Sequence, residues 1–429
     1  MPPLVYLPSE AVLLFDFLGF SYLSRSFDMK NIVLAFSGGL DTSYCIPHLT
    51  NQGYNVIAAT VNTGGFNADE EEKLRSHALD LGADAYHFID AREELYDDFV
   101  SYIIKANVLR GGVYPLSAGP ERYVLARKVV ELADEVNADA IAHGSTGAGN
   151  DQVRFDVSVQ YLDSSLDVIA PIREQELSRE EEISYLREQG HEVDDVSEDY
   201  SINRGFLGTT IGGKETTGSW ESIPEEVWPT VNSVDEAPDE PEELVLSFED
   251  GLPVQLNGES LSGLELLDAL EEVGARHGYG RGYHVGDTIL GVKGRIAFEA
   301  PAPLIMINAH SELEKIVLTK KQLRMKQKLS QDYGDNLHEG QYFDPVMRDL
   351  EAFIDSTQQR VEGDVRIRLH KGSLSVGGVR SPRSLMDQDV AVYGEENFLW
   401  NGRDAEGFCQ IYGIQSTLAK NAQLQGDQQ

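Results

Sequence analysis

The sequence predicts an α/β fold in which a doubly wound parallel-sheet domain precedes an α+β domain and a helical C-terminal tail. Three observations support this prediction. Apolar strand-like runs alternate with helix-like segments up to about residue 195, two of those runs open into glycine-rich polar loops, and later segments mix hairpins with helices. Strands that alternate with helices favour βαβ units and a parallel sheet, with ligands at the carboxyl ends of the strands.

The first half of the chain supplies the alternation. The apolar run NIVLAF, residues 31–36, is followed by SGGLDTS and by a helix-like segment that stops at Gly53. The later segments keep the same order: strand 55–62, helix 69–82, strand 84–90, helix 122–137 and a strand from residue 138. The helix at 69–82 starts with acidic residues and ends at a glycine, as the helix dipole and the usual stop signals favour.

The second half is interpreted as an α+β domain with a tail. Segments 244–259 and 364–379 each place two strand-like runs around a turn, EDG in the first and HKGS in the second, which is typical of hairpins. Helix-like segments accompany them, and an acidic, proline-containing stretch reads as a loop. We therefore expect four parts: an extension at 1–28 (disorder left open), the parallel-sheet domain at 29–195, the α+β domain at 196–405 and the tail at 406–429.

Charge and cysteine content restrict the classes of function. The 429 residues include 72 Asp and Glu against 35 Lys and Arg, giving a formal net charge of −37. A field of this sign repels nucleic acid and anionic membranes, so neither is expected as a partner. Cys45 and Cys409 alone provide neither a disulfide framework nor a cysteine-rich metal site. This low cysteine content fits a reducing compartment, so we expect a cytoplasmic protein. No apolar stretch is long enough to span a bilayer.

The loop SGGLDTS, residues 37–43, has more small and polar residues than a surface turn needs. Its two glycines let the backbone turn sharply and approach a ligand, and the amides that open the next helix point toward it. Ser37, Thr42 and Ser43 add hydroxyl donors. Asp41 has three candidate roles: capping the helix, orienting those donors, or helping to hold a magnesium ion on phosphates. A plain strand-to-helix turn is the alternative, but the place after the first strand of a βαβ series favours a phosphate-binding loop.

A second loop, HGSTGAGNDQVRFD at residues 143–156, follows another strand. Thr146, Asn150, Asp151 and Arg154 bring a hydroxyl, an amide, a carboxylate and a guanidinium into a few positions. A long polar loop is again the alternative, although a structural loop seldom needs so many different hydrogen-bonding groups. Arg154 can hold a carboxylate through two parallel hydrogen bonds. The first loop predicts a phosphate-binding site, and the second favours a ligand-binding role over a plain structural loop.

These motifs resemble those of a known family. SGGxD[ST] is similar to the pyrophosphate loop of the ATP pyrophosphatases, and AFSGGLDTS closely resembles AYSGGLDTS of the argininosuccinate synthases. The second loop resembles that family's HGxTGKGNDQVRFE, and YSINRGFLGTTIGGKE resembles YSxDxNLxGxxxE. Further short matches extend the likeness over residues 29–415. The resemblance is to a divergent variant, because the differences gather at the citrulline site.

The resemblance implies an ATP-dependent ligase of arginine biosynthesis. In this family ATP, with Mg²⁺, adenylylates the ureido oxygen of citrulline and pyrophosphate leaves; the amine of aspartate then displaces AMP and argininosuccinate forms. A homotetramer is also implied. One rival is another ATP pyrophosphatase, such as a tRNA-thiolating or a glutamine-fed synthetase, but the expected cysteines, basic RNA surface and glutaminase domain are missing from the sequence. The other is a nucleotide-binding regulatory module without turnover, which leaves GNDQVRF unexplained.

The family's site residues map onto this chain by motif. The nucleotide site is expected at Ala35, Phe36, Ser37, Gly38, Gly39, Leu40, Asp41, Thr42, Ser43 and Gly144. The aspartate site is expected at Thr146, Asn150 and Asp151, and the citrulline site at Tyr114, Asn150, Arg154, Ser201 and Thr210. Asp41, Asp151 and Arg154 are the candidate catalytic residues. No protein metal site is expected beyond the magnesium ion carried with ATP.

Several positions depart from the family pattern. Ala148 replaces a common lysine, YPLSAGPER replaces YPLGTSLAR with Gly119 at a citrulline-contacting serine, and Gly286 and Phe298 replace a citrulline-binding glutamate and a tyrosine. Two explanations stay open: either Asp287 or another acid binds the α-ammonium, or the substrate is an N-acylated citrulline whose acyl group fills the vacated volume. Four other residues are weighed separately. Lys293 and Arg295 are as consistent with surface pairing as with ligand binding, while a structural role is favoured for His143 and Cys45.

Overall fold

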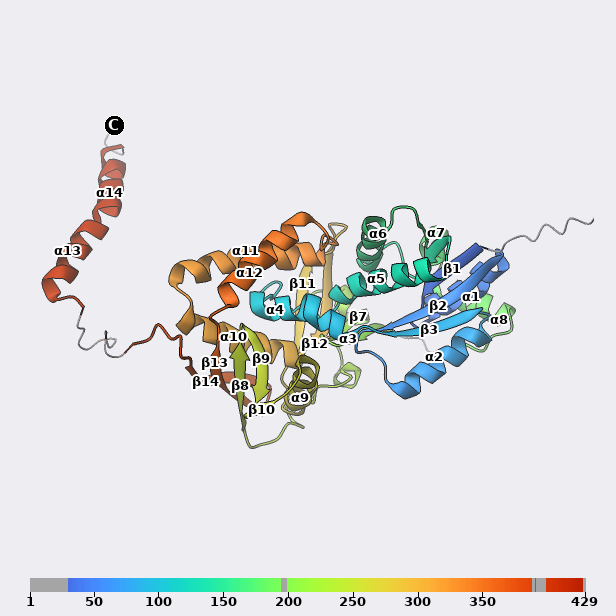
Figure 1. Cartoon of the computed structure of the whole chain (residues 1–429), viewed down its shortest axis with the longest axis horizontal. Coiled ribbons are helices and arrows are strands. Elements are labelled where there is room, and N and C mark those ends of the chain that lie inside the picture. Colours follow the sequence, from blue (N-terminus) through green and yellow to red (C-terminus); the bar gives the residue numbers. More distant parts are fainter. Residues whose placement is uncertain (1–29, 194–198, 388–389, 391–398, 427–429) are drawn as a thin grey trace, which may run out of the picture.

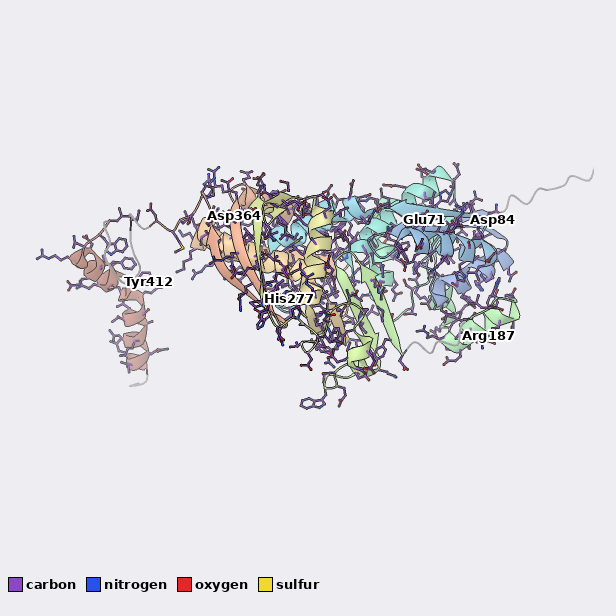
Figure 2. All side chains as sticks on the ribbon, turned by 90° about the horizontal axis from the view of Figure 1, so that it is seen from below. Glu71, Asp84, Arg187, His277, Asp364 and Tyr412 are labelled. Carbon is purple, nitrogen blue, oxygen red and sulfur yellow. The ribbon has the colours of Figure 1, made fainter. Side chains whose placement is uncertain are left out.

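The computed structural model describes residues 30–193, 199–387, 390 and 399–426. The predicted extension at 1–28 lies outside them. Figure 1 shows an elongated chain in which one body carries the parallel sheet, a second carries the remaining sheets, and the last two helices lie apart from both. Side chains cover both bodies, and Tyr412 lies on the separated helices (Figure 2). No helix in these described ranges is long and apolar enough to cross a membrane.

The first body is the predicted doubly wound sheet, in the order β3-β2-β1-β4-β5 with every neighbouring pair parallel. Its strands are β1 (Lys30–Ala35), β2 (Tyr54–Asn62), β3 (Ala85–Asp90), β4 (Ala140–Ala142) and β5 (Asp167–Ile169). The helices are α1 (Leu40–Asn51), α2 (Ala68–Asp80), α5 (Pro120–Glu135), α6 (Asp151–Leu162), α7 (Pro171–Gln175) and α8 (Arg179–Glu188). Strand β1 is buried on both faces. Ile32 and Leu34 pack in a hydrophobic cluster with residues of α1, and Val33 and Ala35 pack in a second hydrophobic cluster with residues of α5.

The strand order places both glycine-rich loops at one point. From β1 the chain proceeds to β2 and β3 on one side, whereas β4 and β5 lie on the other side of β1. The loops after β1 and after β4 therefore flank the topological switch point, where open α/β sheets bind their ligands. The predicted fold class is confirmed, and the place of the site stays a prediction that this strand order favours.

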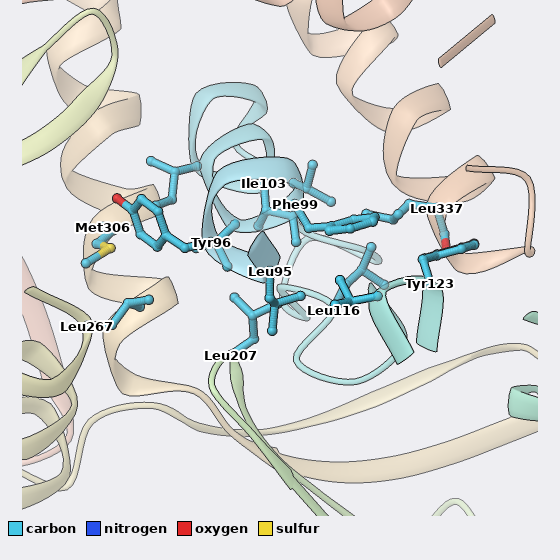
Figure 3. Close-up of a cluster of buried hydrophobic side chains, with 14 of the residues drawn as sticks. Leu95, Tyr96, Phe99, Ile103, Leu116, Tyr123, Leu207, Leu267, Met306 and Leu337 are labelled. Carbon is cyan, nitrogen blue, oxygen red and sulfur yellow. The ribbon is translucent and has the colours of Figure 1, made fainter. Parts of the chain in front are cut away.

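A helical segment of the first half packs within the second body. It comprises α3 (Arg92–Leu95), the π-helix η1 (Tyr96–Val100) and α4 (Ser101–Ala106). Helix α4 contacts α10 (Pro301–Val317), α11 (Lys320–His338) and α12 (Pro345–Gln358). Figure 3 shows its side chains among those of the second half, with Phe99 near Leu337 and Tyr96 near Met306. The hydrophobic core is thus shared, and the division of the chain at residue 195 stays a prediction.

The second half has two antiparallel sheets beside its helices. One has the order β10-β9-β8-β13-β14, and the other has the order β11-β12-β7-β6. The first contains β8 (Glu242–Glu249), β9 (Leu252–Leu256), β10 (Glu259–Ser260), β13 (Gly363–His370) and β14 (Ser373–Arg380). The second contains β6 (Tyr200–Gly205), β7 (Gly208–Gly213), β11 (Arg281–Asp287) and β12 (Lys293–Glu299). Short 3-10 helices at Lys214–Thr217 and Glu225–Val227, then α9 (Gly263–Arg276), α13 (Gly402–Tyr412) and α14 (Ile414–Gly426), complete the elements.

Both predicted hairpins are present and their turn residues explain them. Asp250 and Gly251 have φ values of +47° and +79°, and Lys371 and Gly372 have φ values of +43° and +75°. Two consecutive positive φ values characterise the tight turn whose twist matches that of the flanking strands, and glycine at the second position adopts it at little cost. The expected helical tail is also present, as α13 and α14.

Candidate functional site

The loop after β1 is a pre-formed cradle at the start of α1. Gly38 has φ +77°, and Gly39 is the N-cap residue of α1 without a side-chain cap. The hydroxyl of Thr42 lies 3.2 Å from that of Ser37 and donates to the Gly39 carbonyl, also at 3.2 Å. Ser43 is turned away, since its Oγ bonds to Nε2 of His77 at 2.8 Å. The amides at the helix start remain available, as suits an anion.

Asp41 does not cap the helix but faces a second acid. Glu182 on α8 is buried, with 2 % of its surface exposed, and its Oε2 has no hydrogen-bond partner among the described residues. Burial, followed by the charge of Asp41 and a hydrogen bond to it, raises the pKa of Glu182 to about 8. Burial likewise raises the pKa of Asp41. The two carboxyl groups therefore share a proton beside the loop at neutral pH.

The loop after β4 touches the loop after β1. A Cβ atom built on Gly144 would lie 3.0 Å from Cβ of Asp41 and 3.1 Å from Cγ2 of Thr42, so a larger residue would have to push these atoms apart. His143 supports the loop from behind, because its Nδ1 accepts from the Ser145 amide at 3.1 Å and its Nε2 lies 2.8 Å from Asp156. The structural role expected for His143 agrees with these two partners.

A chain of alternating charges leads away from these loops. Asp151, the first residue of α6, binds Arg154 at 2.8 Å and Arg122 at 3.0 Å. Burial opposes its ionisation, yet the two guanidinium groups hold the pKa of Asp151 at about 2. Arg154 also donates to the carbonyl of His338 at 2.8 Å and to its Nδ1 at 3.0 Å. Each terminal nitrogen of Arg154 keeps one more N–H, so this group still has donors for a ligand.

Asn150 joins the two halves of the chain at this point. Its Oδ1 accepts from the Ile289 amide at 2.9 Å, and Ile289 lies in the loop between β11 and β12. Thr146 and Ala148, by contrast, lie exposed in the loop before α6. The residues expected to hold aspartate therefore flank the contact between the parallel sheet and the four-stranded sheet.

One face of the four-stranded sheet carries the remaining predicted residues. The register pairs Ser201 with Gly212, and Thr210 with Asn203 and Phe298. Because directly paired residues and those two positions apart share a face, Ser201, Thr210 and Phe298 lie on the same one. Tyr114 covers it, with its ring centroid 5.2 Å from that of Phe298. The hydroxyl of Tyr114 is bonded to the backbone of Ala118, so its ring faces the sheet.

Comparison with known proteins identifies the family. A family model described as the arginosuccinate synthase N-terminal HUP domain matches residues 31–192, and one described as its C-terminal domain matches residues 200–419. The chain belongs to the argininosuccinate synthase family. The argininosuccinate synthase of Staphylococcus saprophyticus is 40% identical over 399 residues, which cover 92% of this chain and 98% of that protein. That of Staphylococcus aureus strain JH9 is 39% identical with the same coverage.

Likeness to solved structures is much weaker. A 4-thiouridine synthetase in complex with RNA and ATP matches 38% of this chain and 41% of its own, with 20% identity and a TM-score of 0.29. That score is too low to bear on the function of this chain. The assignment to the argininosuccinate synthase family therefore stands on the sequence relatives and the family models.

The departures from the argininosuccinate synthase pattern have structural explanations. Gly119, with φ +129°, lies over the guanidinium of Arg154: a Cβ atom there would be 3.2 Å from Cζ. A Cβ atom on Gly286 would lie 2.6 Å from Nε2 of His284. Neither position leaves an empty volume, because a neighbouring side chain fills it. The expectation that vacated space at these two positions holds an acyl group is therefore not supported by their surroundings.

Basic and acidic residues on β11 and β12 are structural or solvent-facing. Asp287 is exposed and pairs with Lys293 at 2.6 Å, so its carboxylate points away from Gly286. Arg295 donates to the backbone carbonyls of Gly218 and Glu221 and lies 4.3 Å from the centroid of the Tyr283 ring. The geometry favours the surface-pairing interpretation of Lys293 and gives Arg295 a structural role.

The sequence interpretation missed four residues beside the predicted ones: Glu182, Arg110, His284 and His338. Glu182 could have been found from the helical spacing: it lies four positions before Leu186, and both residues are on the buried face of α8. His338 is the last residue of α11 and meets Arg154 184 positions away, and no local pattern announces such a contact. Cys45, expected to be a core residue, is fully buried.

Proposed function

We propose that this chain catalyses the argininosuccinate synthase reaction: ATP-dependent joining of the ureido group of citrulline, or of an N-acylated citrulline, to aspartate, with release of AMP and pyrophosphate, in arginine biosynthesis. The observation that carries the proposal is the meeting of both glycine-rich loops at the switch point of the sheet, directly beside the Asp151–Arg154 pair. Membership of the argininosuccinate synthase family supports it.

The residues divide into three groups in this proposal. Ala35 to Ser43 and Gly144 hold the nucleotide, with the amides at the start of α1 available to the phosphates. Thr146, Asn150 and Asp151 orient aspartate. Tyr114, Asn150, Arg154, Ser201 and Thr210 hold the ureido substrate. Fixed donors that meet charge moving between phosphate oxygens are the main contribution a protein makes to such a step, because they need no reorganisation as the reaction proceeds.

Magnesium is proposed to accompany ATP. Among the described residues no group of three or more His, Cys, Asp or Glu side chains could hold a metal ion. Mg²⁺ on nucleotides is commonly bound by one or two carboxylates together with phosphates and water, so Asp41 fits it at the edge of the loop. When bound, the ion offsets phosphate charge, while Ser37, Thr42 and the α1 amides position the nucleotide.

The test is product stoichiometry. The protein with ATP, Mg²⁺, aspartate and citrulline or N-acetylcitrulline should release AMP and pyrophosphate in equal amounts. Release of ADP, or of neither product, would contradict the proposal and favour a binding module without turnover. Asp41→Ala should abolish pyrophosphate release, whereas Asp69→Ala, an exposed position on α2, should retain it.

We further propose a cytoplasmic homotetramer that binds neither nucleic acid nor membrane. The large negative charge supports the absence of those partners. Exposed apolar side chains on α13 and α14, including Phe408, Ile411 and Leu418, support assembly through these helices. A monomeric mass in light scattering would contradict the tetramer.

A further inference from the structure

The surroundings of Gly286 are basic. The family pattern described above implies a glutamate at this position, which would suit the α-ammonium of citrulline. In this chain Nε2 of His284 lies 2.6 Å, and a terminal nitrogen of Arg110 3.5 Å, from where a Cβ atom of residue 286 would be. The strand register puts His284 and Gly286 on the same sheet face as Phe298 and Thr210. The basic groups therefore occupy the place of the lost carboxylate within the ureido substrate site.

The His284 ring is packed between Tyr114 and Gly111, and its Nε2 lacks a hydrogen-bond partner among the described residues. Its ring stacks on Tyr114 with centroids 5.3 Å apart, and Gly111 closes on its edge, where a Cβ atom would lie 3.1 Å from Nδ1. The residue is more than nine-tenths buried, and its Nε2 has no partner in the part of the chain that the structure describes. An unpaired buried polar atom costs free energy unless a ligand satisfies it. A neutral imidazole can donate from Nε2 to an acceptor on a ligand.

Arg110 is only loosely engaged by the protein. Its contacts with the carbonyl of Asp287 measure 3.4 Å, and its Nε lies 3.5 Å from Asp335. These distances exceed those of strong charge-assisted hydrogen bonds. Nearby, Nδ1 of His338 accepts from Arg154, so the neutral His338 ring carries its proton on Nε2, which also lacks a well-formed partner. Donors, and not acceptors, therefore predominate at this end of the site.

Three acids around the site are already paired with other groups. Asp287 points to solvent and pairs with Lys293. Glu121, which stands where the family pattern has alanine, accepts from the Gly119 amide at 2.8 Å and faces Arg122. Asp151 is shared by Arg122 and Arg154. An α-ammonium at Gly286 would thus meet the guanidinium of Arg110 and an imidazole nitrogen of His284, and its burial without an anionic partner is unfavourable.

Room for a substituent lies next to these donors. Arg110 and Gly111 also line a cavity of about 610 Å³ between α4, α10 and α11. Ser330 in that cavity is more than nine-tenths buried, and its hydroxyl is without a partner among the described residues. An acyl chain that passes Arg110 would reach this cavity, a space that the filled positions 119 and 286 themselves do not provide.

We infer that the ureido substrate of this chain carries a hydrogen-bond acceptor on its α-nitrogen in place of an ammonium: an N-acylated citrulline whose acyl oxygens are bound by Arg110 and His284. This inference rests on the proposed function and specifies its substrate. A neutral acyl carbonyl and an acyl group with its own carboxylate share the required chemistry, and the substrates tested below distinguish them.

The experiment measures kcat/KM from pyrophosphate release with four compounds: citrulline, N-acetylcitrulline, N-succinylcitrulline and 5-ureidopentanoate, which lacks the α-nitrogen. The better acyl compound should exceed citrulline by about 30-fold or more, the factor expected when a buried charge loses its partner. Preference for the succinyl over the acetyl compound would place the acyl carboxylate at Arg110. Preference for the acetyl over the succinyl compound would indicate that the acyl group is neutral.

Variants test the two basic residues. Arg110→Met should reduce the ratio of kcat/KM between acylated and free citrulline by about tenfold or more, whereas Arg366→Met, an exposed arginine on β13, should leave it unchanged. Gly286→Glu combined with His284→Ala removes the steric conflict and should shift preference toward citrulline. Both kcat/KM values in the ratio are measured on the same variant. A smaller fraction of folded protein lowers the two values equally, so it cannot change the ratio.

The results that would overturn the inference are distinct from those that would overturn the proposed function. Wild-type preference for citrulline, or 5-ureidopentanoate exceeding both acyl compounds, would refute acceptor binding while leaving the ligase assignment intact. An unchanged ratio in Arg110→Met would also refute it. Failure of all four compounds to release pyrophosphate would refute the proposed function and the inference together.

Discussion

Replacing Glu182 by glutamine tests the carboxyl pair beside the loop after β1. Glutamine has nearly the same shape, and its amide can donate to Asp41 as the protonated carboxyl does. The pKa of Glu182 is raised from 4.5 to about 8. Between these values the folded protein keeps a proton that the unfolded chain releases, so the unfolded state binds fewer protons and the free energy of unfolding falls as pH rises.

The magnitude follows from one proton. The slope is at most about 1.4 kcal/mol per pH unit, so the wild type should lose roughly 2 to 3 kcal/mol relative to Glu182→Gln between pH 5.5 and 7.5. The raised pKa of Asp41 acts in the same direction. Taking the difference between the two proteins removes the general repulsion caused by a net charge of −37.

Urea unfolding at pH 5.5, 6.5 and 7.5 and constant ionic strength measures this difference. Glu180→Gln, an exposed neighbour on α8, is the matched control and should follow the wild type at every pH. If the Glu182→Gln curve runs parallel to that of the wild type, the pair does not share a proton and the reasoning is wrong.

Three further substitutions have definite expected outcomes. Arg154→Ala should weaken binding of the ureido substrate by about 2–5 kcal/mol, because the substrate carboxylate loses a partner that binds it through two hydrogen bonds. The KM for ATP serves as the comparison. An unchanged KM for the ureido substrate would argue against carboxylate binding by Arg154. Gly144→Val should raise KM for ATP by the equivalent of about 1–3 kcal/mol, since its Cβ atom meets Asp41 at 3.0 Å; normal ATP kinetics would show that the loops part freely. Lys326→Met should destabilise the fold by about 3–5 kcal/mol, because Lys326 is buried 2.8 Å from Glu314 and its loss leaves a buried charge. Thermal unfolding checks this last change, and adding Glu314→Gln should recover part of the loss.

Several elements could be predicted from local pattern because local physics specifies them. An apolar run that ends in SGGLDTS becomes β1, a turn at Gly38 and the start of α1. Asp250–Gly251 and Lys371–Gly372 form tight turns wherever two strands flank them. In the same way, alternating strands and helices determine that the sheet is parallel and that its loops meet at one edge.

Other features depend on contacts between distant segments, which no local pattern encodes. Helix α4 reads as part of the first domain, yet it packs against α10, α11 and α12 because their apolar faces are complementary. Glu182 reads as one of several acids on an exposed helix, and only the packing of α8 against α1 brings it to Asp41.

By itself, then, the sequence determined the fold class, the two glycine-rich loops and the family, because these follow from periodicity, turn chemistry and contiguous motifs. The tertiary structure decided what surrounds the substituted positions. Gly286 alone signals only the absence of a side chain; the register of β11 and β12, together with Arg110 from the segment after α4, shows that basic side chains surround it. This environment depends on side chains that meet across strands and between the two halves of the chain, and long-range packing alone places them there.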